Sequence, residues 1–288
     1  SINKDFGFNV AFNMSAIKNK MTELDGDVSY IGLPTSVIHS LNFDQEVSRS
    51  AIGQPIGSFY AYKEDGLFQS EAEIKSYTNN KGELLQPNAK PGDIKFVDVN
   101  GDGVIDGNDR DYIGNPLPDV TAGLTLGVNF HNFDLSLFFQ GMFGNDVYDL
   151  TRYVGDFYNQ SQYNKNSRVV NAWTPTNTNT DIPRVTMDDP NNNIRPSSYY
   201  VQDASFVRLK NMKIGYSVPQ SILSKIKFNS LYIYAQATNL FTITGYDGID
   251  PEVGLQSYSS DYRNLDMGVD RGIYPLSRTF TFGVNVSF

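Results

Sequence analysis

The sequence contains no cysteine, which excludes disulfides, thiolate metal sites and cysteine nucleophiles. Only two histidines occur, His39 and His131, and neither belongs to a metal-binding spacing such as H-E-x-x-H. Charged residues make up 19% of the 288 positions, below the ~25% that is usual for soluble domains. The net charge is −9 and no basic cluster is present, so we expect no nucleic-acid partner.

Long apolar runs are also missing, and without a run of about 18 apolar residues a transmembrane helix is not expected. The first residues, SINKDFGFNV, show no initiating Met and no signal-peptide character, so we expect the true beginning of the protein to lie upstream. No G-x-S-x-G, phosphate-binding loop or dinucleotide fingerprint occurs, and we therefore expect no enzyme. Aromatic residues, in contrast, are abundant, with 18 Tyr and 19 Phe.

An acidic stretch within residues 91–118 has the spacing of a 12-residue calcium loop of the EF-hand kind. The expected calcium ligands are Asp98, Asn100, Asp102, the carbonyl of Val104, Asp106 and Asp109. Gly103 stands at the position where such a loop turns sharply. The last ligand is Asp109 instead of the usual Glu, and Asp-Asn-Gly clusters also form ordinary turns. A structural calcium ion and a plain acidic turn both stay open.

Alternation of apolar and polar residues predicts several long strands, each with one apolar face. The clearest are two runs within 119–143, joined by a tight turn at His131-Asn132 as in a long hairpin. Further strands are expected over 6–16, 47–63, 204–217, 230–241 and 277–288. In the second of these ranges Pro55 and Gly57 predict a bulge or an edge.

Helical and irregular segments separate these strands. Short helices are expected over 70–78, where Ser70 and Glu73 have capping-box spacing, and over 218–226, with a helical turn near 168–172. The connections 18–46, 144–202 and 242–271 are long and irregular, as functional or disordered loops usually are.

Strand length and loop asymmetry favour an all-β fold, an antiparallel transmembrane β-barrel segment of about seven long strands. A strand of ~10 residues tilted by ~45° spans the hydrocarbon of a bilayer, and barrels of this kind alternate long outer loops with short inner turns. A soluble sandwich is the competing interpretation, because its strands alternate as well.

Motifs in order along nearly the whole chain resemble the C-terminal part of SusC/RagA-type TonB-dependent outer-membrane transporters. They are PIGSFYAYKEDGLFQSEAE (55–73), PGDIKFVDVNGDGVIDGNDRDYIGNPLPD (91–119), FDLSLFFQGMFGNDVYD (133–149), AWTP (172–175), DIPR (181–184), SFVRLKNMKIGYSVP (205–219), YAQATNLFTITGYDGIDPEVG (234–254) and YPLSRTFTFGVNVSF (274–288). In this family a plug and a TonB-contacting segment precede a 22-stranded barrel. The resemblance implies that residues 1–288 form part of such a barrel without the plug, and that 91–118 is an extracellular loop within it.

The resemblance also implies energised import across the bacterial outer membrane. A nutrient, an oligosaccharide or a peptide, is captured under a SusD-like surface lipoprotein, and TonB acts through the missing N-terminal part. The turn at His131 then faces the periplasm and the long connections face outside. Calcium outside the cell suits a site of modest affinity, ~10⁻⁴ to 10⁻³ M.

Aromatic side chains in the expected outer loops are candidates for contact with sugar rings, with packing inside the loops as the alternative. The candidates for substrate binding are Trp173, Tyr158, Tyr199 and Tyr200. Arg208 and Lys210 are expected to pair with carboxylates either in the lumen or at the rim. We assign no chemistry to Asp250-Pro251-Glu252.

The alternative function is a soluble, calcium-stabilised carbohydrate-binding or adhesion module. It would share the alternation, the aromatic residues and the calcium-type loop. Solubility separates the two functions, because a barrel segment with lipid-facing side chains and open edges aggregates or enters membranes, whereas a module stays in solution.

Overall fold

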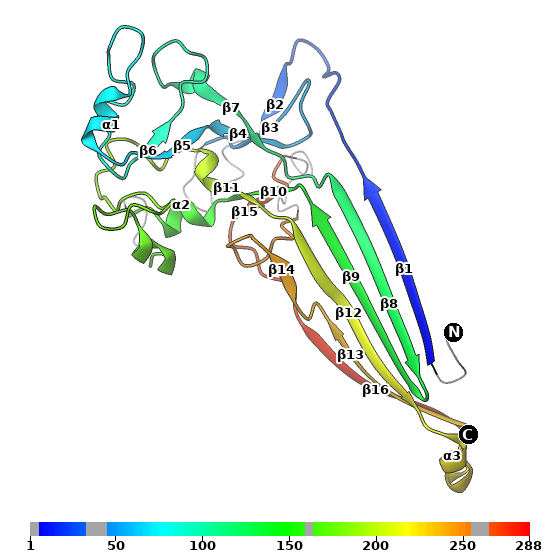
Figure 1. Cartoon of the computed structure of the whole chain (residues 1–288). Coiled ribbons are helices and arrows are strands. Elements are labelled where there is room, and N and C mark those ends of the chain that lie inside the picture. Colours follow the sequence, from blue (N-terminus) through cyan, green and yellow to red (C-terminus); the bar gives the residue numbers. More distant parts are fainter. Residues whose placement is uncertain (1–5, 33–44, 159–163, 255–264) are drawn as a thin grey trace.

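The structure is a computed structural model that describes residues 6–32, 45–158, 164–254 and 265–288. Its main feature is a long antiparallel sheet with the strand order β1-β8-β9-β12-β13-β16 (Figure 1). These strands are β1 (Phe6–Ala16), β8 (Val120–Phe130), β9 (Phe133–Phe143), β12 (Phe206–Ser217), β13 (Ser230–Thr238) and β16 (Thr279–Ser287). A short strand, β14 (Thr242–Thr244), pairs with β12 as the seventh member. Six of the seven expected long strands form this sheet, and β14 lies in the connection that was expected over 242–271.

The strands pair so that side chains of one kind share one face of the sheet. Val10 lies opposite Leu126, and Leu126 lies opposite Leu137 on the next strand. Since successive side chains point to opposite faces, these pairs build a continuous apolar face, and Gly, Asn, Ser and Thr residues build the other. On the polar face a Cβ at Gly127 would lie 1.8 Å from Asn9 Oδ1, so only glycine lets the Asn9 side chain lie across β8.

Short connections join the strands at one end of the sheet. His131, with φ of 53°, forms the turn between β8 and β9, and α3 (Gln220–Ile226) joins β12 to β13. Lys227 ends α3 in the left-handed conformation (φ 58°), as is common after a helix. The C-terminus lies at this same end (Figure 1).

The long connections gather at the opposite end, where they form a second body (Figure 1). We call this body the cap and define it as the described residues of 17–119, 144–205, 239–241 and 245–278. The cap contains a sheet of order β2-β3-β4-β7, a pair β5-β6 and a sheet of order β11-β10-β15. Its strands are β2 (Tyr30–Gly32), β3 (Ser48–Ala51), β4 (Ser58–Tyr62), β5 (Glu64–Leu67), β6 (Ile94–Phe96), β7 (Arg110–Gly114), β10 (Asp146–Asp149), β11 (Val201–Asp203) and β15 (Val269–Asp270).

Short helices complete the cap. They are α1 (Glu71–Ser76), η2 (Gly107–Asp109), α2 (Thr151–Gly155), η3 (Ser167–Asn171) and η4 (Ser198–Tyr200). The N-cap predicted for the first is present, because the Ser70 side chain accepts a hydrogen bond from Glu73 N, while the Glu73 carboxylate accepts from Gln69 N at 2.7 Å. Among the described residues, the helices are all too short or too polar to cross a membrane.

The predicted long strand over 47–63 is wrong. The chain forms two short strands, β3 and β4, which pair with each other inside the cap. Between them lie Pro55, which lacks a backbone donor, and Gly57, which adopts φ of 71°. The two residues that were expected to weaken the strand interrupt it.

A buried aromatic core holds the cap together. Tyr148 and Tyr200 have no exposed surface, and their rings stack with centroids 5.4 Å apart. The Phe59 ring packs against Tyr148 at 5.7 Å. These residues come from β4, β10 and η4, so the core joins connections that are far apart in the sequence. The cap is a packed body, and not a set of independent loops.

Candidate functional site

The acidic loop 98–109 folds around its own carboxylates. Asp98 accepts hydrogen bonds from Gly101 N (2.7 Å) and Gly103 N (2.9 Å), and Gly103 takes φ of 88° at the predicted turn. Asp109 is fully buried and accepts from Val99 N and Asp106 N, both at 2.8 Å. The carboxylates are thus turned toward backbone amides of the loop.

The remaining expected ligands behave in the same way. Asn100 Oδ1 accepts from Asp102 N, Asp102 Oδ1 accepts from Val104 N, and Asp106 Oδ1 accepts from Asn108 N. Within the part of the chain that the structure describes, no group of three or more His, Cys, Asp or Glu side chains is placed to hold a metal ion. The oxygen-rich ligand set suits calcium chemically, and calcium binding by this loop stays a prediction.

Three of the four aromatic candidates lie inside the cap. Trp173 is 8% exposed, Tyr199 is 2% exposed and Tyr200 is fully buried. Trp173 Nε1 donates to Gln69 Oε1 at 2.9 Å. These three residues pack the cap core, as the alternative of packing inside the loops expects, and their contact with a substrate stays a prediction. Tyr158, 38% exposed, is accessible, and its contact with substrate stays a prediction.

The motifs AWTP, PGD and DIPR meet in one buried cluster of the cap. A Cβ at Gly92 would lie 2.4 Å from Trp173 Cε3, so the indole requires glycine there. Next to it, Arg184 forms an ion pair with Asp93 (Nε–Oδ1 2.6 Å), and Asn193 Nδ2 donates to the same carboxylate at 2.9 Å. These residues hold segments near 92, 173, 184 and 193 together, so their role is to frame the cap.

Arg208 and Lys210 pair at the rim of the sheet, where β12 enters the cap. Arg208 contacts Asp250 (Nη2–Oδ1 2.5 Å) and Glu252 (Nη1–Oε2 2.9 Å), and Lys210 reaches Glu252 at 2.7 Å. Of the two alternatives, the rim salt bridge is the one observed. The segment Asp250-Pro251-Glu252 supplies both carboxylates. From the sequence, no role was assigned to this segment. A usable signal was the matched spacing, because Arg208 and Lys210 lie two positions apart and Asp250 and Glu252 also lie two positions apart.

A polar cleft of about 570 Å³ lies between α2, η3 and the segment around Asp247. Arg152 Nη2 donates to Asp247 Oδ2 at 3.0 Å, and Arg168 Nη1 lies 3.6 Å from the same oxygen. The motif over 234–254 contains Asp247 between Gly245 and Gly248, but no spacing in the sequence related Asp247 to Arg152 or Arg168.

A second cavity of about 330 Å³ adjoins the cleft and shares Arg152 and Asp247 with it. Glu64 lines this cavity, and its backbone N donates to Ser198 Oγ at 3.0 Å. Burial, reinforced by the nearby Asp181 carboxylate, raises the pKa of Glu64 to about 7. The cavity therefore holds a carboxyl group that changes charge near neutral pH.

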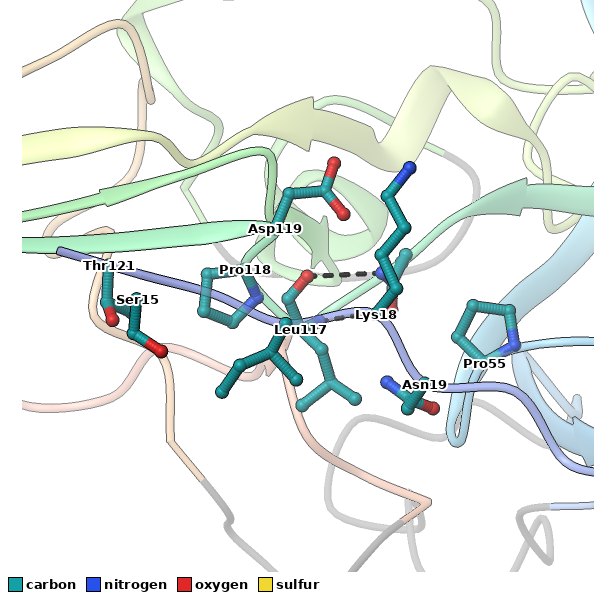
Figure 2. A pocket seen from close by; sticks show the side chains of 10 residues that line it. Ser15, Lys18, Asn19, Pro55, Leu117, Pro118, Asp119 and Thr121 are labelled. Atoms are coloured by element: carbon teal, nitrogen blue, oxygen red, sulfur yellow. Dashed lines mark hydrogen bonds between the residues drawn. The ribbon is translucent and has the colours of Figure 1, made fainter.

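A third cavity of about 340 Å³ lies where β1 and β8 reach the cap (Figure 2). Ser15 and Thr121 are paired across the two strands, and Ile17 N donates to the Asp119 carbonyl at 3.0 Å. Figure 2 shows the Lys18 and Asp119 side chains extending to the same side of the strands. The other residues that line this third cavity include Leu117, Pro118 and Pro55, so the cavity offers a mainly apolar surface.

Searches against known proteins identify relatives over almost the whole chain. It is 38% identical over 287 residues to the TonB-dependent receptor P3 of Formosa agariphila, covering 99% of this chain and 27% of the receptor. It is 27% identical to the TonB-dependent receptor SusC of Bacteroides thetaiotaomicron, covering all of this chain and 25% of that protein. This chain thus spans about a quarter of the length of the curated relatives that it matches.

Comparison with solved structures gives a result that is consistent with these sequence relatives. The fold matches a chain in the structure of the RagAB peptide transporter with a TM-score of 0.71 and 25% identity, covering all of this chain and 28% of that one. No family model matches the sequence. The resemblance indicated by the sequence motifs and the antiparallel fold class are both confirmed.

Proposed function

Because this chain corresponds to a segment of TonB-dependent receptors of the SusC/RagA type, we propose that it forms part of the barrel wall and surface cap of an outer-membrane nutrient importer. The relatives are named as receptors and an importer, which points to a transport role and not to catalysis. We propose an oligosaccharide or a peptide as the cargo, and the solved structures of the RagAB peptide importer support the peptide.

The observation that carries the proposal is the apolar face of the long sheet. Large side chains on this face are exposed, including Phe12 (64%), Phe282 (81%) and Val284 (58%). Fully burying one such side chain is worth ~1.5–3 kcal/mol, so a row of them facing water is unfavourable and facing lipid is favourable. The opposite face carries Gly, Asn, Thr and Ser, as suits a wet lumen.

Strand length supports the same role. β1, β8 and β9 each have 11 residues, which at ~3.4 Å per residue gives a length of about 37 Å. With a tilt of ~45° this length covers ~26 Å along the membrane normal, close to the apolar band of outer-membrane barrels.

The cap supports a location at the cell surface. Long connections of outer-membrane barrels face outside and short turns face the periplasm, and this sheet has its connections sorted in that way (Figure 1). We place the cap outside, where it contacts a SusD-like surface lipoprotein that closes over the cargo. TonB acts through a plug that other parts of the whole receptor supply.

The 98–109 loop is proposed to bind a structural calcium ion. The support is its ligand set, which combines four Asp carboxylates, the Asn100 amide and the Val104 carbonyl in one short loop. Its place in the cap exposes it to the higher calcium concentration outside the cell.

Purification of the whole receptor tests the proposed function. We would solubilise outer membranes in mild detergent, capture the tagged receptor and identify the co-purifying chains by mass spectrometry. A stoichiometric surface lipoprotein supports the importer. A receptor that is found in the soluble fraction, without such a partner, would refute it in favour of a soluble binding module.

A further inference from the structure

The cleft between α2 and η3 contains two guanidinium groups that converge on one exposed carboxylate. Arg152 Nη2 lies 3.0 Å and Arg168 Nη1 lies 3.6 Å from Asp247 Oδ2. The Arg152 side chain is 5% exposed and that of Arg168 is 21% exposed, whereas that of Asp247 is 61% exposed. The buried partners are thus the two cations, and their shared anion lies at the surface.

The arginines are held in place independently of Asp247. Arg152 Nη1 donates to the Tyr199 carbonyl at 2.7 Å, and Arg168 Nε lies 3.8 Å from Asp156 Oδ2. Both guanidinium groups lie near the Tyr199 ring, 5.4 and 5.9 Å from its centroid. The Tyr199 hydroxyl in turn donates to Asp156 at 2.7 Å. A fixed pair of guanidinium groups is preorganised for a carboxylate.

The arginine pair also retains unused donors. Arg152 Nε and Arg168 Nη1 are buried and make no hydrogen bond to the described residues. Their nearest carboxylate oxygens, on Asp149 and Asp247, are at 3.5 and 3.6 Å, within ion-pair range only. A ligand carboxylate in the cleft could therefore gain hydrogen bonds that Asp247 does not make.

Asp247 is the part of this arrangement that is easiest to move. It lies between Gly245 and Gly248, and a Cβ at Gly245 would meet no atom within 4 Å. Beyond the two arginines, the contact described for Asp247 is its backbone N, which donates to Gln202 at 3.1 Å. An ion pair this exposed contributes at most about 1 kcal/mol, equivalent to less than about a tenfold factor in binding, so displacing Asp247 costs little.

We propose that Arg152 and Arg168 form a binding site for a ligand carboxylate, and that Asp247 occupies this site as an internal substitute until a ligand displaces it. The carboxylate could be the C-terminus of a peptide or the acid group of a uronic acid. The cleft of about 570 Å³ has the size of a small-ligand site. The proposal extends the import role proposed above, and its test measures binding without requiring import.

Other carboxylates restrict the ligand to a single negative charge. Asp149 and Asp270 also line the cleft. Asp149 already accepts from Thr151 and from Gln202, and Asp270 accepts from Tyr246 at 2.6 Å. Their charges repel additional anions, so a polyanionic ligand is disfavoured.

The test uses the whole receptor, purified in detergent, and four probes measured by calorimetry or ligand-observed NMR. The probes are N-acetyl-dialanine, its C-terminal amide, glucuronate and its methyl ester. Asp247→Asn removes the internal carboxylate, and we expect it to tighten binding of one acid by about fivefold, the factor that corresponds to about 1 kcal/mol, with no gain for the corresponding neutral probe. Adding Arg168→Gln should abolish that gain.

The matched control is Asp111→Asn, which removes the same charge from an exposed position whose described side-chain contact is to Tyr112 N. It should leave all four affinities unchanged. Tighter binding of the peptide acid alone assigns the site to a peptide C-terminus, and tighter binding of glucuronate alone assigns it to a uronic acid. Equal affinity of each acid and its neutral partner in folded Asp247→Asn receptor would overturn the proposal. If Asp247→Asn does not fold, Asp247→Gly in the same glycine-containing turn provides the same measurement.

Discussion

Replacing Arg208 with Met tests the idea that a buried ion pair fastens the cap to the sheet. Arg208 has a side chain that is 3% exposed, and it donates to Thr242 (2.7 Å), Glu252 (2.9 Å) and Asp250 (2.5 Å). All three partners belong to the segment that follows β13. The substitution keeps the aliphatic stem and removes every one of these contacts.

The expected cost follows from what the substitution leaves behind. The Asp250 side chain is 7% exposed and would lose its cation, and breaking a buried pair in this way costs ~3–5 kcal/mol. Asp250 still accepts from Glu252 N (2.9 Å) and Leu276 N (3.1 Å). We therefore expect the lower end of that range, about 3 kcal/mol.

Limited proteolysis of the detergent-purified receptor measures this cost locally. When opening and closing are fast, cleavage within residues 239–254 follows the population of the open state, so about 3 kcal/mol corresponds to roughly a hundredfold faster cleavage. Lys210→Met is the control. Among the described residues, the ion pair of the Lys210 side chain is with the more exposed Glu252, so its loss should cost less than about 1 kcal/mol.

A double-mutant cycle gives the decisive result. If the pair is coupled, Arg208→Met combined with Asp250→Asn should cost at least about 1 kcal/mol less than the sum of the single changes. Additive effects, or cleavage as slow as in the wild type, would contradict the proposed fastening of the cap.

The other predictions concern pH, calcium and lipid. Since the folded pKa of Glu64, about 7, exceeds its ordinary value of 4.5, the protonated carboxyl stabilises the cap fully below pH 4.5, and this contribution is lost as the pH rises through 7. Glu64→Gln should therefore raise the free energy of unfolding at pH 8 by up to about 3 kcal/mol, because it removes a partly buried charge. At pH 4.5 the substitution should change the free energy of unfolding little, and parallel thermal melts at the two pH values measure the difference. Removal of calcium with EDTA should increase protease cleavage of loop 98–109 in the wild type. The double substitution Asp98→Ala and Asp102→Ala should make this cleavage insensitive to EDTA. Equal cleavage of the wild type with and without EDTA would argue against calcium binding. If Phe282 faces the bilayer centre, Phe282→Lys should destabilise the membrane-integrated barrel by ~2–4 kcal/mol, which heat-modifiability assays measure. Thr281→Lys, on the opposite face of the strand, should not have this effect. Equal effects of the two substitutions would contradict the lipid-facing assignment.

The long strands were predictable because their signal is local. Alternation with period two places each apolar residue within two positions of the next, and the hairpin expected within 119–143 appears as β8 and β9, joined at His131. The predicted strand over 47–63 failed for a reason that is also local, since Pro55 and Gly57 end the strand where they were expected only to bend it.

The contacts within the cap could not be predicted, because they join residues that sequence spacing does not relate. Trp173 and Gln69 are 104 positions apart, Arg152 and Asp247 are 95 apart, and Arg208 and Asp250 are 42 apart. Connections of this length have no periodicity to constrain them, and their fold depends on tertiary packing. Aromatic residues in such segments consequently looked like ligand contacts in the sequence and are core residues in the structure.

The division between the cluster around Trp173 and the cleft around Asp247 bears on where the proposed ligand specificity would reside. The motifs AWTP, PGD and DIPR supply Gly92, Asp93, Trp173 and Arg184, which meet in a largely buried cluster that exposes little side-chain surface. A buried frame of this kind fixes where the connections run, while the side chains lining the cleft can change without disturbing it. The cleft combines residues inside the motifs, such as Asp149 and Asp247, with residues outside them, such as Arg152 and Arg168. We therefore expect the cleft residues outside the motifs to be the positions to compare when a substrate is sought.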